Sequence, residues 1–178
     1  YKRQVLTFAP YFPEYGPYVE GTGAVLKVVP PQEPAFQPNL DAFEEMLTEN
    51  VTCVLINTPN NPTGSVMTRE TMAKIAKLAV KHDLLVISDD VYNTLLYAGE
   101  EAPCIASFPG MKERTVIVNS FSKSYAMTGW RLGWLAAAAP VVAEIAKAHQ
   151  YLVSSAVSFE MDAAARALAV DPTPMLNV

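Results

Sequence analysis

The sequence has few residues of the kinds that build metal centres and disulfide frameworks. Its 178 residues include two cysteines, Cys53 and Cys104, and two histidines, His82 and His149, each isolated from the others. Two separated cysteines form neither a disulfide framework nor a zinc site. We therefore expect no bound metal and a reducing compartment, the cytoplasm.

Charge is also scarce. Charged residues make up 17% of the chain, and the net charge is −5. Proteins that bind nucleic acids usually carry a basic face or stripe, so we expect no nucleic-acid partner. No apolar run reaches the roughly 20 residues that a membrane-spanning helix needs, and we expect no membrane partner either.

Hydrophobic residues, by contrast, make up 51% of the chain. This is a rich supply for its length, so we expect part of the apolar surface to lie against a subunit or another segment of the protein. The chain begins with Tyr1 and not with methionine. We expect residues 1–178 to be one domain, incomplete at both ends, of a longer protein.

Short apolar runs alternate with segments of helical periodicity. The three main runs, at 51–56, 84–87 and 116–118, do not alternate apolar with polar residues, which is typical of strands buried on both faces of a parallel sheet. Further strands are predicted at 5–8, 25–29 and 131–137, with an extended loop at 30–38 and helices after Asn39 and at 68–82, 140–153 and 158–170. The alternation predicts a three-layer α/β/α fold with a mostly parallel sheet.

Polar residues follow each of the three main runs. Asn57 and the segment 58–64 follow the first run, residues 88–92 the second, and residues 119–123 the third. In open α/β sheets, ligands bind beyond the carboxyl ends of the strands. We therefore expect these polar residues to line one crevice.

The side chains at these strand ends suit an anionic ligand that also carries a basic nitrogen. The hydroxyls of Ser120 and Ser122 and the fork of Arg131 can bind phosphate oxygens. Asp89 is a carboxylate at a buried strand end and needs a cationic partner, such as a protonated pyridine nitrogen. An apolar setting beside another cation favours the amine form of Lys123, which is nucleophilic toward an aldehyde.

Four blocks of residues, taken in order, resemble a known family. They are Ala-Pro-Tyr-Phe at 9–12, Asn-Asn-Pro-Thr-Gly at 60–64, Ser-Asp-Asp-Val-Tyr at 88–92, and the stretch from Ser-Phe-Ser-Lys to Gly-Trp-Arg-Leu-Gly at 120–133. Their order and spacing resemble class I/II aminotransferases, which are fold-type-I enzymes dependent on pyridoxal 5'-phosphate (PLP). The resemblance covers nearly the whole chain and implies a truncated large domain of a homodimeric enzyme.

The resemblance also implies a role for each matching residue. Lys123 resembles the lysine that forms a Schiff base with PLP and moves a proton, and Asp89 resembles the partner of the pyridinium nitrogen. Tyr92 and Asn61 resemble the donors to the phenolic oxygen, and Phe12 the aromatic that stacks on the ring. The residues that resemble phosphate ligands are Ser120, Ser122 and Arg131.

Simpler structural roles also exist for some of these residues. Phe12 could be a core residue among the neighbouring tyrosines, and an Asn-Pro pair such as Asn61-Pro62 usually marks a turn. We expect the peptide bond before Pro62 to be cis, as X-Pro bonds in tight turns often are.

The implied activity is transfer of an amino group between an α-amino acid and a 2-oxo acid. Two alternatives remain open: a PLP-dependent carbon–sulfur lyase of the same fold, and the PLP-binding effector domain of a bacterial transcription regulator. In the family, the arginine that binds the substrate carboxylate and the first phosphate-binding turn lie outside the blocks found here. We therefore expect no transamination by residues 1–178 alone.

Overall fold

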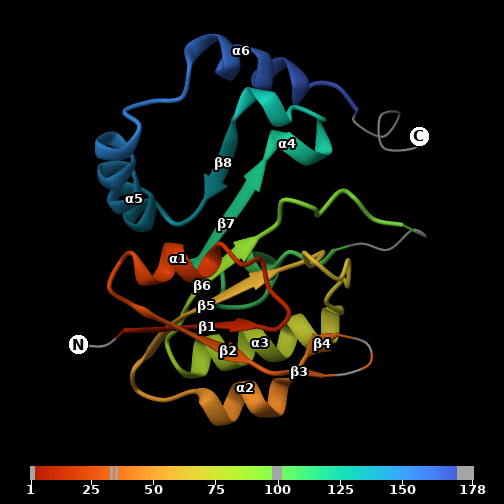
Figure 1. The fold of residues 1–178 in the computed structure, drawn as a ribbon, viewed down its shortest axis with the longest axis vertical. Coiled ribbons are helices and arrows are strands. Elements are labelled where there is room, and N and C mark those ends of the chain that lie inside the picture. Colours follow the sequence, from red (N-terminus) through yellow and green to blue (C-terminus); the bar gives the residue numbers. More distant parts are fainter. Residues whose placement is uncertain (1–2, 33, 35, 98–101, 172–178) are drawn as a thin grey trace.

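The computed structural model describes residues 3–32, 34, 36–97 and 102–171. A six-stranded sheet with the order β2-β1-β5-β6-β7-β8 forms its centre (Figure 1). Neighbouring strands are parallel except β8, which is antiparallel to β7. The strands are β1 (Gln4–Phe8), β2 (Val25–Val29), β5 (Val51–Asn57), β6 (Leu85–Asp89), β7 (Thr115–Ser120) and β8 (Gly133–Ala136). The predicted α/β fold with a mostly parallel sheet is confirmed.

Helices lie on both sides of this sheet. In Figure 1, α2 and α3 lie below the strands and α1 lies above them. The helices are α1 (Tyr15–Glu20), α2 (Leu40–Met46), α3 (Arg69–Lys81), α4 (Phe121–Ser124), α5 (Ala139–Leu152) and α6 (Ser158–Ala167), with 3-10 turns at Ile105–Ser107 and Thr128–Trp130. The sequence did not predict α1 or α4, both of which are short. It also missed a small hairpin in the expected loop, formed by β3 (Pro31–Gln32) and β4 (Gln37–Pro38).

The two helices below the sheet begin at side chains that cap them. The Oδ1 atom of Asn39 accepts a hydrogen bond from the Ala42 amide at 3.1 Å, and the Oγ1 atom of Thr68 accepts one from the Thr71 amide at 3.0 Å. Each cap satisfies a backbone N–H group that the first helical turn leaves without a partner. The caps therefore fix where α2 and α3 start.

The main hydrophobic core lies between the sheet and these two helices. Four of the apolar positions that recur three and four residues apart on α3 are buried, namely Met72, Ile75, Ala76 and Ala79, whereas the fifth, Val80, is 42% exposed. Phe43 of α2 is completely buried. The large residues of this cluster that are almost completely buried are Leu6, Val29, Phe43, Val54, Ile56, Met72, Ile75, Leu84, Val86, Ile105 and Met111. This packing makes β5 and β6 a rigid support for the residues that follow them.

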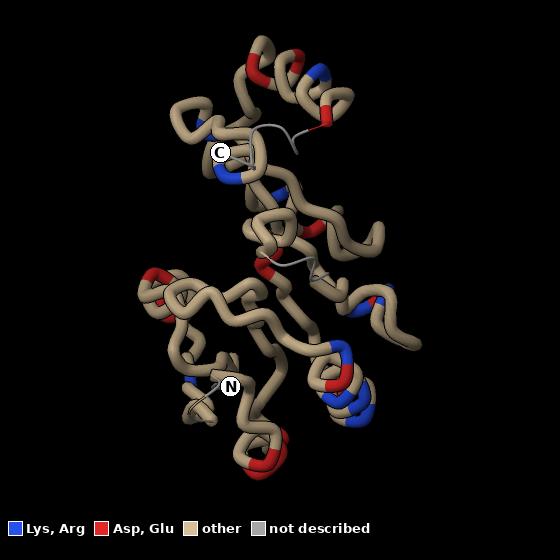
Figure 2. The backbone as a smooth tube through the Cα atoms, turned by 90° about the vertical axis from the view of Figure 1, so that its right-hand side faces the viewer, with Lys and Arg blue, Asp and Glu red and all other residues tan. Residues whose placement is uncertain are grey.

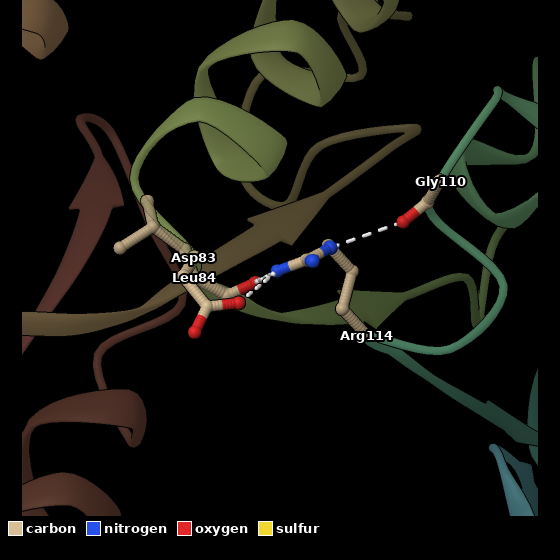
Figure 3. Close-up of polar contacts among 4 residues, drawn as sticks. All are labelled: Asp83, Leu84, Gly110 and Arg114. Atoms are coloured by element: carbon tan, nitrogen blue, oxygen red, sulfur yellow. Dashed lines mark hydrogen bonds and ion pairs between the residues drawn. The ribbon is translucent and has the colours of Figure 1, made fainter.

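Arg114 links the segments that precede β6 and β7. Its Nη1 atom lies 2.9 Å from Oδ1 of Asp83 and 3.3 Å from the Leu84 carbonyl oxygen, and its Nε atom donates to the Gly110 carbonyl at 3.0 Å (Figure 3). One guanidinium therefore joins the loop after α3 to the loop before β7.

The part of the chain from β8 onward is much less buried. None of the described residues of α5 is buried, and a small cluster of Phe121, Leu132 and Ala164 joins α4 to α6. Gly133 at the start of β8 approaches β7 so closely that a Cβ atom there would lie 2.7 Å from the Asn119 carbonyl oxygen. Large apolar side chains are exposed on this part, among them Trp134, Leu135, Tyr151, Leu152, Val153, Phe159, Met161 and Leu168.

Charged residues are spread over the molecule. Basic and acidic positions both occur in the upper and the lower part of the chain in Figure 2, so neither part carries one sign of charge alone. Among the residues that the structure describes, no helix is long and apolar enough to cross a membrane. No cluster of three or more potential metal ligands occurs among them either.

Candidate active site

The strand ends that carry polar residues are adjacent in the sheet. Asn57 at the end of β5 pairs with Asp89 at the end of β6, and Asp89 pairs with Val118 of β7. Ser120, the last residue of β7, then leads directly into α4, which carries Lys123. The parallel arrangement thus brings distant segments of the sequence to one edge of the sheet.

A cavity of about 380 Å³ opens at this edge, within the size range of small-molecule sites. All eight residues that the sequence singles out line it: Phe12, Asn61, Asp89, Tyr92, Ser120, Ser122, Lys123 and Arg131. Asn57, Asn119 and Thr128 contribute further polar groups to its wall.

Asp89 is held by three different parts of the chain. Its Oδ2 atom accepts a hydrogen bond of 2.6 Å from the hydroxyl of Tyr15, and its Oδ1 atom accepts one of 3.3 Å from the Val91 amide. Its backbone carbonyl accepts a bond of 2.9 Å from the side chain of Asn57. These contacts restrain the orientation of the Asp89 carboxylate at the wall of the cavity.

Asn57 also positions the loop that contains Asn61. Its Oδ1 atom accepts a hydrogen bond of 2.7 Å from the Asn61 amide. One buried side chain therefore fixes both Asp89 and Asn61 relative to the end of β5. The Asn61–Pro62 peptide is cis, as expected from the sequence.

Lys123 faces Tyr92 across the cavity wall. Its Nζ atom lies 5.6 Å from the centroid of the Tyr92 ring, a distance at which a cation and an aromatic face attract each other. The prediction that Lys123 lies in an apolar setting is wrong. Among the described residues, Lys123 is exposed. Helix α4, which carries this side chain, is a single short turn.

The three residues expected to bind phosphate differ in their present contacts. The hydroxyl of Ser120 donates to the Leu132 carbonyl at 3.2 Å and accepts from the Ser122 amide at 3.0 Å. Within the described part of the chain, the hydroxyl of Ser122 makes no hydrogen bond. Arg131 adopts a left-handed conformation with φ 52°, and its guanidinium donates to the Thr128 carbonyl at 2.9 Å. Ser122 is therefore the more available of the two serines.

Asp90 directly follows Asp89, just after the end of β6, and does not line the cavity. Its side chain is buried and accepts a hydrogen bond of 2.6 Å from the hydroxyl of Ser88. Burial raises the pKa of the Asp90 carboxyl to about 6; the Ser88 bond opposes this shift and the Asp89 charge adds to it. Asp90 therefore gains or loses its proton near neutral pH, outside the cavity.

The raised pKa of Asp90 predicts a specific pH dependence of stability. An unfolded aspartate ionises near its ordinary pKa of 3.8 and the folded one near 6, so the stability provided by protonated Asp90 is lost as the pH rises between these values. The shift corresponds to about 3 kcal/mol. The asparagine of Asp90→Asn cannot ionise. The difference in free energy of unfolding between this variant and the native protein, measured by urea titration, should therefore shift by about 2 kcal/mol in favour of the variant between pH 4 and pH 8.

A matched control for this measurement is Asp83→Asn. Asp83 lies just before β6, its side chain is 93% exposed, and it pairs with Arg114 at the surface. Exposed ion pairs contribute little, so this variant should change much less with pH than Asp90→Asn. A difference between Asp90→Asn and the native protein that stays constant from pH 4 to pH 8 would contradict the assignment.

The sequence predicted the contacts of two side chains of this site incompletely or not at all. Asn57 was placed in the crevice by its position after an apolar run, but its double role as a clamp depends on the loop that returns to it. Tyr15 gave no signal, because it stands among Tyr11, Phe12 and Tyr18, and α1 contains Gly16 and Pro17. Only the fold reveals which aromatic in this stretch reaches Asp89.

Comparisons with known proteins agree with this geometry. The family model described as aminotransferase class I and II matches residues 1–172. The chain is 43% identical over 166 residues to aromatic-amino-acid aminotransferase 2 of Thermococcus litoralis and, over the same length, to aspartate aminotransferase of Pyrococcus abyssi. Each match covers 93% of this chain and 43% of the relative, so the chain spans less than half the length of these curated relatives.

The solved structures give the same result for the fold. The crystal structure of the aromatic aminotransferase from Pyrococcus horikoshii OT3 superimposes with a TM-score of 0.94 at 39% identity, over 98% of this chain and 48% of that one. A match of this extent in both sequence and structure identifies the family. The chain belongs to the class I and II aminotransferases.

Proposed function

We propose that the chain is the cofactor-binding large domain of a longer PLP-dependent aminotransferase, which transfers an amino group between an α-amino acid and a 2-oxo acid. The observation that carries the proposal is that one cavity is lined by both the amine of Lys123 and the carboxylate of Asp89. Family membership supports it, since PLP is the cofactor that aminotransferases use. When bound, PLP stabilises negative charge at the substrate carbon that loses a proton.

The residues of the cavity fit this cofactor. Asp89, already held by two donors, would accept a hydrogen bond from the protonated ring nitrogen. The amine of Lys123 would hold the cofactor by condensing with its aldehyde group, with release of water, and would then carry a proton to and from the substrate. Tyr92 and Asn61 line the wall where they can donate to the phenolic oxygen, and Phe12 provides an aromatic surface for the ring.

The phosphate would lie near the end of β7. Ser122 and Arg131 offer a free hydroxyl and a guanidinium there, and the Ser120 hydroxyl can join them by releasing the Leu132 carbonyl. Charge-assisted hydrogen bonds of this kind are stronger than neutral ones. The fit of both ends of the cavity supports PLP over a ligand that carries only a phosphate.

Three further features of the whole protein are part of this proposal. The exposed apolar side chains on β8, α5 and α6 support additional chain segments and a second subunit covering this part, that is, a homodimer. Cys53 and Cys104 are both free thiols, which supports a cytoplasmic location. The substrates are amino acids and 2-oxo acids; relatives named for aromatic amino acids and for aspartate leave the choice among them open.

The test is an assay of the full-length protein with PLP. It is incubated with 2-oxoglutarate and single amino acids, and glutamate formation is measured together with the release of ammonia and pyruvate. Formation of glutamate without ammonia supports the proposal. Release of ammonia and pyruvate without amino transfer would replace it with the lyase, and binding of PLP without either reaction would favour the effector domain of a regulator.

A further inference from the structure

Tyr15 makes the shortest hydrogen bond to the Asp89 carboxylate, at 2.6 Å, although α1 and β6 are far apart in the sequence. The Tyr15 side chain is only 6% exposed. Burial and the neighbouring Asp89 charge raise the pKa of its hydroxyl above the ordinary value. Tyr15 therefore remains protonated and acts as a permanent donor to Asp89.

The ring of Tyr15 is itself fixed by its neighbours. It contacts Phe12 edge-on at a centroid distance of 5.6 Å and stacks on Tyr11 at 6.5 Å, and its amide donates to the Phe12 carbonyl at 3.1 Å. Phe12 lines the cavity. The same packing that fixes Phe12 thus also fixes the hydroxyl that holds Asp89.

A carboxylate at a cavity wall needs such a contact to keep one orientation. The terminal torsion of an aspartate is broad, so the group can rotate unless hydrogen bonds restrain it. The bond from the Val91 amide is longer, 3.3 Å, and comes from the same strand end. Tyr15 is the donor that reaches Asp89 from a separate, packed element.

We propose that Tyr15 is a positioning residue for the cofactor: its hydroxyl orients the Asp89 carboxylate toward the protonated ring nitrogen. This assignment rests on the proposed function. Because the Tyr15 hydroxyl acts through Asp89, the effect of this hydroxyl exists only for a ligand whose ring carries that nitrogen. A tyrosine that served packing alone would affect all ligands of the cavity equally.

This difference gives a direct test by binding, without turnover. The dissociation constants of the full-length apoprotein are measured by tryptophan fluorescence for PLP and for its analogue in which CH replaces the ring nitrogen. The two ligands share the aldehyde and the phosphate. Tyr15→Phe should weaken PLP binding by about tenfold, the loss expected for a hydrogen bond to a charged group, and change binding of the analogue by less than about twofold.

Two further variants sharpen the result. Tyr18→Phe removes a hydroxyl from the same helix at a residue that is 67% exposed, and it should leave both constants unchanged. In an Asp89→Asn background, Tyr15→Phe should have little further effect on PLP, because the two residues act as a unit. Circular dichroism of each variant verifies that it is folded.

Three outcomes would overturn the assignment. An equal loss for PLP and the analogue would make Tyr15 a packing residue, and an unchanged affinity for PLP would remove its role altogether. Failure of the native apoprotein to bind either ligand would instead refute the proposed function, and the positioning role with it. Binding by the native protein therefore separates the two kinds of failure.

Discussion

Lys123→Ala in the full-length protein is expected to abolish covalent attachment of PLP and to reduce the transamination rate by about a thousandfold or more. The amine of Lys123 is the nucleophile that the cavity offers to the aldehyde, and it is also the group placed to move the proton. Loss of a positioned acid–base group alone costs about 10²–10⁴-fold in rate.

The attachment is measured by reducing the protein with borohydride in the presence of PLP and locating the modified peptide by mass spectrometry. The native protein should carry the cofactor on Lys123 and the variant should carry none. Lys147→Ala is the matched control, because Lys147 is an exposed lysine that pairs with Glu144 on α5. Modification at another lysine with normal turnover in Lys123→Ala would contradict the assignment.

The positions of Asp89 and Lys123 could be predicted because they depend on local patterns. Non-alternating apolar runs predict buried parallel strands, and the carboxyl ends of such strands meet at one edge of the sheet. The structure places the ends of β5 and β6 side by side as expected. The polar residues after these runs were therefore expected in one place, and in the structure they line the same cavity.

Features that depend on side-chain packing could not be predicted in this way. The sequence does not reveal that Tyr15, among several aromatics, is the one whose hydroxyl meets Asp89. It also does not show that Lys123 is exposed or that the Ser120 hydroxyl caps α4. Each of these depends on contacts between segments that come together only in the fold.

The sequence contains an excess of apolar residues, but it does not predict which of them are exposed in the second half of the chain. It indicated that some apolar residues lie against another segment or subunit, without identifying these residues. In the structure they gather on β8, α5 and α6, at the edge of the sheet beyond β7. Their location follows from the strand order, which periodicity alone does not give.

Asp89→Asn in the full-length protein is expected to lower kcat/KM for transamination by about 10²–10⁴-fold. Asparagine has nearly the same shape and keeps an oxygen that can accept the hydrogen bond from Tyr15, but it lacks the negative charge. Removing one partner of a largely desolvated ion pair costs about 3–5 kcal/mol, which corresponds to this range of rates if the ring nitrogen no longer keeps its proton. Steady-state kinetics with a saturating concentration of PLP measures the effect, and near-normal turnover would contradict the role.

The neighbouring residue provides the control for this experiment. Asp90→Asn makes the same chemical change one position further along, at a buried side chain that contacts Ser88 and does not line the cavity. It should increase stability at pH 8, since it removes a buried charge, and leave kcat/KM within about threefold of the native value, since the Asp90 side chain does not line the cavity. Asp89→Asn should do the reverse, with a large loss of rate and little change in the urea midpoint. If the two variants lost activity equally, any negative charge near the end of β6 would support the reaction. The specific pairing of Asp89 with the cofactor would then be wrong.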